Sequence, residues 1–182
     1  MKKLISTLIL SASLFLVPNT DEAAARKWKP APLQSAQDYL NINHKINDQD
    51  EVFLMWVAPE YLEKQPATKP IRDVLSRYVL VGIVHFTIDG QGVFKFRDVN
   101  DLTVELPGNQ VFSPMNEDEL PPILPTVITF LSKALAGGMG KMGQAMKFYV
   151  YDTGNIDTCS SGTVWVRYLK ERYEYKTPLP NC

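Results

Sequence analysis

The sequence predicts a mainly β fold, either an antiparallel sheet or an immunoglobulin-like sandwich of about six to seven strands, with one amphipathic helix packed on it. Apolar and aromatic runs of strand length recur along the chain and are separated by gaps of hairpin length. Only residues 126–136 repeat apolar side chains at clear helical spacing. Because strands and helices do not alternate, a parallel α/β sheet is excluded.

The first half of the domain contains four predicted strands. Residues 51–57 are apolar and β-branched, and residues 78–88 are apolar on both alternating faces, so the second run is expected to be a central strand. Residues 89–92 (Asp-Gly-Gln-Gly) form a turn signal, after which residues 93–97 alternate as a hairpin partner. Alternation over residues 102–106 then completes a predicted meander of three strands.

The predicted helix follows an acidic and Pro-rich linker, residues 116–125. Since proline disrupts a helix interior, the helix is expected to start only after Pro125, with Thr126 as its cap. It is expected to stop at Gly137, which gives the helical insertion 126–136. The apolar face of this helix consists of Val127, Phe130, Leu131 and Leu135.

Two more strands are predicted at residues 147–152 and 163–168. After residue 169, apolar and polar residues continue to alternate. The apolar residues now occupy odd instead of even positions, which predicts a bulge or bend near Lys170.

The N-terminal residues 1–25 have the order of a bacterial export signal, with a basic start, a short apolar run and a small-residue cleavage site. The apolar run, residues 4–17, is shorter than the ~20 residues that span a bilayer. We expect cleavage near Ala25 and a periplasmic or secreted protein. Residues 26–50 would then form an N-terminal arm, and residues 51–182 a single β-rich domain.

The chain has two cysteines, Cys159 and Cys182. An even count in an exported chain predicts one disulfide, which would hold the C-terminus. A loop of this size contributes roughly 3 kcal/mol in the chain-entropy model. The alternative, a nucleophilic Cys159, would need a free thiolate.

Composition excludes several classes of function. With 19 basic and 20 acidic residues the formal charge is −1, so nucleic acid is not an expected partner. The two histidines and two cysteines have no zinc-ligand spacing. The glycines of residues 138–143 match the dinucleotide-binding pattern, but they follow a helix and precede a strand, the reverse of the required order. We therefore expect neither a cofactor nor a metal.

Asp152-Thr153-Gly154 follows an apolar strand and resembles the active-site turn of aspartic peptidases. Because those enzymes share one proton between two carboxylates, the resemblance implies a homodimer that uses Asp152 as its catalytic residue. Asn155 stands where the family usually has Ala or Ser, and no apolar-apolar-Gly segment follows. The other interpretation is a turn in which the Asp152 side chain caps backbone N–H groups.

Two surfaces are candidates for binding. An exposed row of C-terminal rings could stack on sugars or peptide side chains, although alternate aromatics more commonly fill sheet cores. The rings of that row are Tyr149, Tyr151, Trp165, Tyr173 and Tyr175. The apolar, Gly-rich residues 123–146 could instead lie in a membrane interface, or pack on the sheet.

From these features we expect an exported, β-rich module with a non-catalytic binding or envelope-structural role. Its partner would be a protein, a glycan or another envelope component. Membrane-interface association through residues 123–146 and a peptidase that uses Asp152 are the alternatives.

Overall fold

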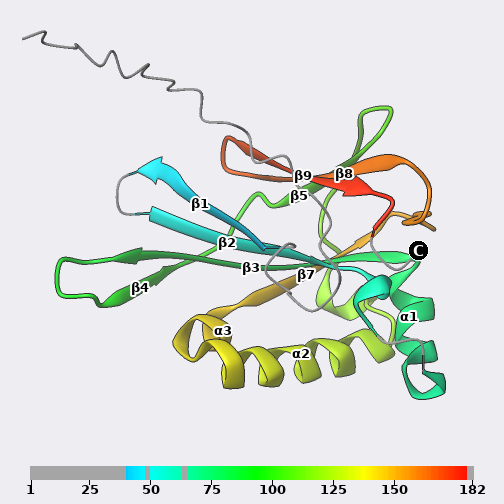
Figure 1. Cartoon of the computed structure of the whole chain (residues 1–182), viewed down its shortest axis with the longest axis horizontal. Coiled ribbons are helices and arrows are strands. Elements are labelled where there is room, and N and C mark those ends of the chain that lie inside the picture. Colours follow the sequence, from blue (N-terminus) through cyan, green and yellow to red (C-terminus); the bar gives the residue numbers. More distant parts are fainter. Residues whose placement is uncertain (1–39, 48–49, 63–64, 180–182) are drawn as a thin grey trace, which may run out of the picture.

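The computed structural model describes residues 40–47, 50–62 and 65–179. The predicted signal peptide, most of the predicted arm and Cys182 lie outside the described residues. The chain is mainly β, as the sequence predicts, and is built from two antiparallel sheets and a helical layer. Figure 1 shows three layers, with sheet B (β5, β6, β8 and β9) above sheet A (β1–β4 and β7) and the helices α2 and α3 below.

Sheet A is organised around one long strand. Its members are β1 (Leu40–Asn47), β2 (Asp50–Val57), β3 (Tyr78–Ile88), β4 (Phe94–Arg97) and β7 (Lys147–Asp152). β3 pairs with β2 along one edge, and along the other edge it pairs first with β7 and then with β4. The prediction of a central strand at these residues is confirmed.

β1 lies within the region predicted as an N-terminal arm. It pairs with β2, with Leu40 opposite Met55, so the sheet begins before residue 50. The signal for this strand is the alternation of Leu40, Ile42 and Ile46 among polar residues, a pattern typical of a strand.

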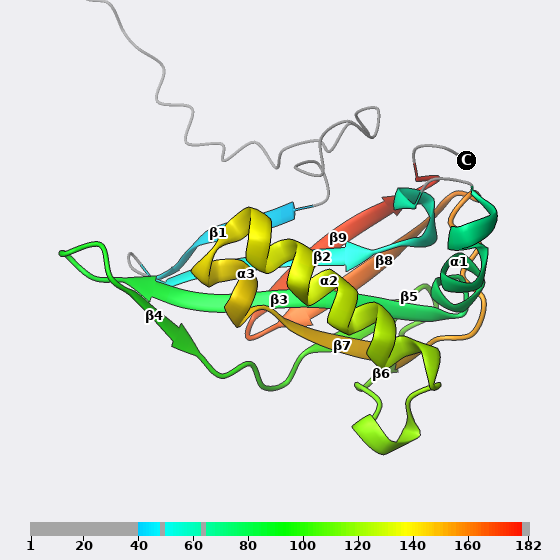
Figure 2. The same ribbon diagram turned by 90° about the horizontal axis from the view of Figure 1, so that it is seen from below.

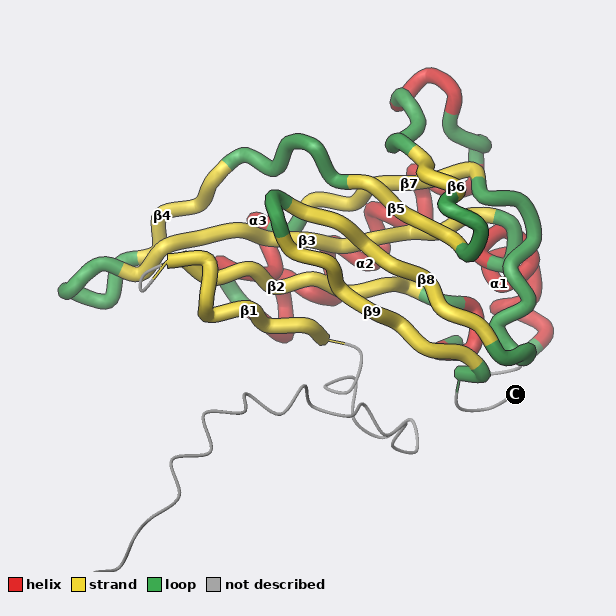
Figure 3. The backbone as a smooth tube through the Cα atoms, turned by 90° about the horizontal axis from the view of Figure 1, so that it is seen from above, coloured by secondary structure: helices red, strands yellow, loops and turns green. Residues whose placement is uncertain are grey.

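Sheet B contains β5 (Thr103–Leu106), β6 (Gln110–Phe112), β8 (Gly162–Tyr168) and β9 (Glu171–Thr177), in the order β6-β5-β8-β9. Figure 3 shows this sheet lying across sheet A, with the helices behind both. The predicted three-stranded meander is wrong, because β5 pairs with β6 and β8 rather than with β4.

The segment between β4 and β5 explains the failed meander. Val99 and Leu102 are buried in the core between the two sheets. The hydroxyl of Tyr149 donates to the Val99 carbonyl (3.0 Å), and that of Tyr151 donates to the Leu102 carbonyl (3.2 Å). Because this segment is buried and hydrogen-bonded in the core, the chain leaves sheet A after β4 and enters sheet B at β5.

The predicted bulge near Lys170 is a hairpin turn between β8 and β9. Tyr168 pairs with Glu171 across a two-residue connection, in which Leu169 has φ 55°. In an antiparallel pair joined by two residues, an even position faces an odd one, as Val164 faces Tyr175. The shift from even to odd apolar positions therefore reflects a change of strand.

The helical layer covers the outer face of sheet A (Figure 2). α2 spans Ile123–Met139 and is longer at both ends than the predicted 126–136. Pro125 is tolerated as its third residue, because the first four N–H groups of a helix have no intrahelical acceptor. Gly137 does not end the helix, which stops at Gly140, where φ is 58°.

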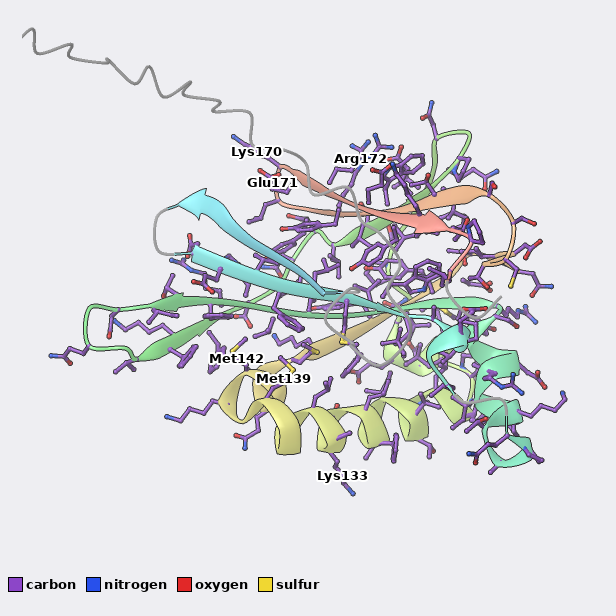
Figure 4. The ribbon with its side chains drawn as sticks, viewed as in Figure 1. Lys133, Met139, Met142, Lys170, Glu171 and Arg172 are labelled. Carbon is purple, nitrogen blue, oxygen red and sulfur yellow. The ribbon has the colours of Figure 1, made fainter. Side chains whose placement is uncertain are left out.

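A second, short helix, α3 (Lys141–Ala145), packs directly on α2. A Cβ atom at Gly143 would lie 2.0 Å from the carbonyl oxygen of Leu135, so only glycine permits this approach. Met139 and Met142 lie between the helices and sheet A, as Figure 4 shows. The glycine motif at residues 138–143 is therefore a helix junction.

The core has two parts, one on each face of β3. Odd positions of β3 face sheet B and share that core with β2, β8 and β9; the buried members on β3 are Val79, Val81 and Ile83. Even positions face the helices; their buried members on β3 are Tyr78, Leu80, Val84 and Phe86.

Four short helices complete the described chain. They are η2 (Pro59–Tyr61), η3 (Pro66–Thr68), α1 (Lys69–Leu75) and η4 (Glu117–Glu119). The first three form the connection from β2 to β3, with α1 at one end of the sandwich (Figure 1).

Candidate ligand-binding site

The predicted aromatic row is divided between the core and the surface. Tyr151, Tyr173 and Tyr175 are buried between the two sheets, and Tyr149 packs partly buried against the same core. Trp165 is half-buried on the outer face of sheet B, where the Arg172 guanidinium lies 4.0 Å from its ring centroid. These rings therefore do not form a continuous exposed binding surface.

The predicted helix face is also divided. Val127 is buried, and Leu131 and Leu135 are partly buried against sheet A. Phe130, in contrast, is 66% exposed and points to the solvent side of α2. Among the described residues, no helix combines the length and the apolar character needed to cross a membrane.

Asp152 ends β7 and is exposed. Its Oδ1 accepts a hydrogen bond from the Gly154 backbone N–H at 3.4 Å, and Gly154 has φ 69°. This geometry is that of an Asx-type turn.

A buried polar cluster connects the two sheets at His85. Its Nδ1 lies 2.9 Å from the Tyr168 hydroxyl, and its Nε2 lies 3.7 Å from Asp50 Oδ1, which is 3.0 Å from Arg97 Nε. Burial is the main cause that lowers the pKa of His85, partly opposed by Asp50. Within the described ranges, no group of three or more His, Cys, Asp or Glu side chains could hold a metal ion.

A second buried charge, Glu105, lies in sheet B. One carboxylate oxygen accepts from Arg167 Nε at 2.5 Å and the other accepts from Arg172 Nη2 at 2.9 Å. Both oxygens are therefore occupied by charge-assisted hydrogen bonds.

A pocket of about 250 Å³ lies between η2, α1 and the turn 157–160, and we call it the α1 pocket. Four of the seven lining residues have charged side chains, and a fifth has a hydroxyl group. The lining residues are Pro59, Glu60, Lys69, Arg72, Asp73, Ser76 and Cys159.

The spacing of residues along α1 explains how it contributes to this pocket. Arg72 and Asp73 lie three and four residues after Lys69. Ser76 in turn lies four and three residues after them, so all four residues are on one face of a helix. The Ser76 hydroxyl donates to the Asp73 carbonyl at 2.8 Å and so ends the helix. This face is directed toward η2, which supplies Glu60.

The charges of the α1 pocket are only partly paired. Lys69 Nζ lies 2.5 Å from Asp73 Oδ2, so these two charges neutralise each other. Glu60 Oε1 accepts a hydrogen bond from the Thr158 hydroxyl. Glu60 Oε2 and Arg72 Nε are shielded from solvent and have no hydrogen-bond partner.

The sequence analysis does not identify this pocket. The charged spacing on α1 is visible in the sequence, but Glu60 and Cys159 join it only through the fold. Leu179, the last described residue, lies beside the turn 157–160, since its N–H donates to the Thr158 carbonyl at 2.8 Å. Cys182 is outside the described residues, so its disulfide with Cys159 stays a prediction, which this contact supports.

Comparison of the chain with family models, with curated proteins and with solved structures finds no match. Its function therefore has to be inferred from its own residues.

Proposed function

We propose that the chain is an exported, non-catalytic binding module, and that its ligand occupies the α1 pocket. The observation that carries this proposal is the pair of shielded atoms without partners, Glu60 Oε2 and Arg72 Nε. Buried polar atoms are almost always hydrogen-bonded, and leaving one unpaired costs about 1–3 kcal/mol. A bound ligand would supply the missing partners once the Glu60 and Arg72 side chains turn these atoms toward the pocket.

The lining of the pocket favours binding over catalysis. Nucleophilic catalysis needs a base within hydrogen-bond reach of the nucleophile. Among the described lining residues, the Ser76 hydroxyl donates to the Asp73 carbonyl, and Cys159 is the residue for which a disulfide is predicted. The pocket therefore offers recognition groups without an activated nucleophile.

Export and the disulfide belong to the same proposal. The leader-like residues 1–25 support export, and the contact between Leu179 and Thr158 supports the disulfide, because it brings Leu179, three residues before Cys182, close to Cys159. The packing of two antiparallel sheets around a shared core supports an immunoglobulin-like arrangement, which also remains a proposal.

Amide chemical-shift mapping tests the binding site. The ¹⁵N-labelled protein is screened against a mixed set of small amines, carboxylates, sugars and amino acids. We expect the bound compounds to shift amides of η2, α1 and residues 157–160, and Arg72→Gln to weaken these shifts. The exposed Lys170→Gln is the matched control. A screen without binders, or with binders only at other residues, contradicts the proposal.

A second candidate function is association with a membrane interface through the outer face of α2. Phe130 is the most exposed large apolar side chain among the described residues, and Lys133 points away from the sheets beside it (Figure 4). Residues 123–146 contain no acidic side chain. An aromatic residue flanked by lysines suits an anionic lipid surface.

Co-sedimentation with anionic vesicles tests this second function. We expect Phe130→Asp to abolish binding. Leu169→Asp, at another exposed apolar residue on the turn between β8 and β9, serves as the control and should retain it. Equal sedimentation of the wild type and Phe130→Asp would exclude this role for α2.

A further inference from the structure

We infer that the α1 pocket selects a small zwitterion, a molecule that carries both an ammonium group and a carboxylate, as free amino acids do. This inference rests on the proposed function and names the ligand class of the same site. It follows from the charges that line the pocket and from how many of them the protein itself pairs.

The charges in the lining balance. Two are basic, Lys69 and Arg72, and two are acidic, Glu60 and Asp73. Lys69 and Asp73 form an ion pair with each other. One group of each sign is left, and each has an atom that is shielded from water and lacks a partner.

The two remaining groups come from different elements on either side of the pocket. Glu60 belongs to η2 and Arg72 to α1, and no ion pair joins them among the described contacts. The Glu60 carboxylate is a pure acceptor, suited to an ammonium group. The Arg72 guanidinium is a donor fork, suited to a carboxylate. A ligand between them needs both functions.

A ligand with a single charge fits less well. A simple anion would meet Arg72 but leave Glu60 unpaired and add repulsion, and a simple cation or a metal ion would do the same at Arg72. Either would place a net charge in a partly buried site, which is unfavourable. A zwitterion adds no net charge and satisfies both groups.

The size of the pocket limits the ligand. At about 250 Å³ it is below the 300–1,000 Å³ of sites for drug-sized molecules. A free amino acid or a short ω-amino acid is therefore a better match than a peptide or an oligosaccharide.

Titration with a matched panel tests the inference. The probes are glycine, β-alanine, 4-aminobutyrate and 6-aminohexanoate, which carry the same two charges at increasing separation. Each is compared with the carboxylate and the amine that lack one of its charges, such as butyrate and butylamine. Dissociation constants are measured from amide shifts of η2 and α1. We expect at least one zwitterion to bind about tenfold or more tightly than either of its single-charge analogues.

Two variants show whether each charge acts as assigned. Glu60→Gln should remove the advantage of the best zwitterion over its carboxylate-only analogue, and that analogue should bind at least as tightly as to the wild type. Arg72→Gln should weaken it to the level of the amine-only analogue. The controls Glu171→Gln and Lys170→Gln lie at the β8–β9 turn, far from α1 (Figure 4), and should have no effect. Amide-shift dispersion confirms that every variant is folded.

The possible results separate the inference from the proposed function. Binding of a single-charge analogue as tightly as its zwitterion overturns the inference but leaves the α1 pocket as a binding site. If no member of the panel shifts the pocket amides, the inference is also overturned, and the mixed screen alone then decides the proposed function.

Discussion

Glu105 and Glu60 each have a carboxylate oxygen shielded from solvent, but the hydrogen bonding of the two carboxylates differs. Glu105 in sheet B has both oxygens bound by arginines, and one of these, Arg172, also stacks on Trp165. Glu60 in the α1 pocket has one oxygen bound by Thr158 and the other without a partner.

The difference would distinguish a structural charge, Glu105, from Glu60, the charge that we propose binds a ligand. A buried carboxylate that is fully hydrogen-bonded is part of the scaffold, and removing its partners should destabilise the fold. A charged group with an unpaired, shielded atom has less protein-made stabilisation to lose when it is replaced. Loss of stability and loss of binding should therefore occur in different variants.

The largest effect on stability is expected when Glu105 loses the two arginines that pair with it. The double variant Arg167→Met and Arg172→Met leaves Glu105, 5% exposed, without a counter-charge. Breaking a buried pair costs 3–5 kcal/mol, and because both arginines are about half exposed we expect about 3 kcal/mol. Urea unfolding measures this loss, with Lys176→Met on the same sheet as control. A loss below about 1 kcal/mol would show that Glu105 is not a structural charge.

A smaller effect is expected at the polar cluster between the sheets. Tyr168→Phe removes the hydroxyl that lies 2.9 Å from His85 Nδ1 and leaves a buried nitrogen unpaired. The expected loss in free energy of unfolding is about 1–2 kcal/mol. Tyr78→Phe is the control, because no described hydrogen bond involves its hydroxyl. Equal stability of both variants would contradict a role for this hydrogen bond.

The same cluster predicts a pH dependence. The unfolded histidine has the ordinary pKa of 6.5, and burial lowers the pKa of His85 in the folded chain. As the pH falls through 6.5, the unfolded state takes up a proton first, so the free energy of unfolding should decrease. Chemical denaturation at pH 7.5 and 5.5 should show a larger decrease for the wild type than for His85→Gln. Parallel decreases would assign the effect to other groups.

The smallest effect on stability is expected in the α1 pocket. Glu60→Gln should change the free energy of unfolding by less than about 0.5 kcal/mol, because one shielded oxygen has no partner to lose. Arg72→Met should raise it slightly, since an unpaired donor is removed. Urea unfolding checks both variants. A loss of about 2 kcal/mol in either would mean that these charges are structural after all.

Local patterns predict much of the fold. The strands β2, β3 and β7 follow from their apolar, β-branched and aromatic runs, and the turn at residues 89–92 follows from its glycines. The sequence predicts the start of α2 too late, at residue 126. The rule against proline in a helix interior does not apply to Pro125, because this residue lies in the first turn. The partner of β5 could not be predicted, because burial of Val99 and Leu102 is a property of both sheets together.

The candidate site depends even more on tertiary structure. The spacing of Lys69, Arg72 and Asp73 predicts a charged helix face, which is most often only a solvated surface. Glu60 lies in the same pocket as this helix face only because η2 packs against α1, and no local sequence pattern predicts that contact. The predicted surfaces at the C-terminal aromatics and on α2 were chosen by composition, which cannot distinguish a core ring from an exposed one.

The junction between α2 and α3 has a consequence for the ancestry of this domain. Because a single methyl group at Gly143 would collide with the carbonyl of Leu135, the two helices can keep this crossing only while that position has no side chain. Distant homologues that have lost every other similarity should still carry glycine there, a few residues ahead of an apolar strand. A glycine at this position, a few residues before an apolar strand, can therefore be used to recognise such relatives.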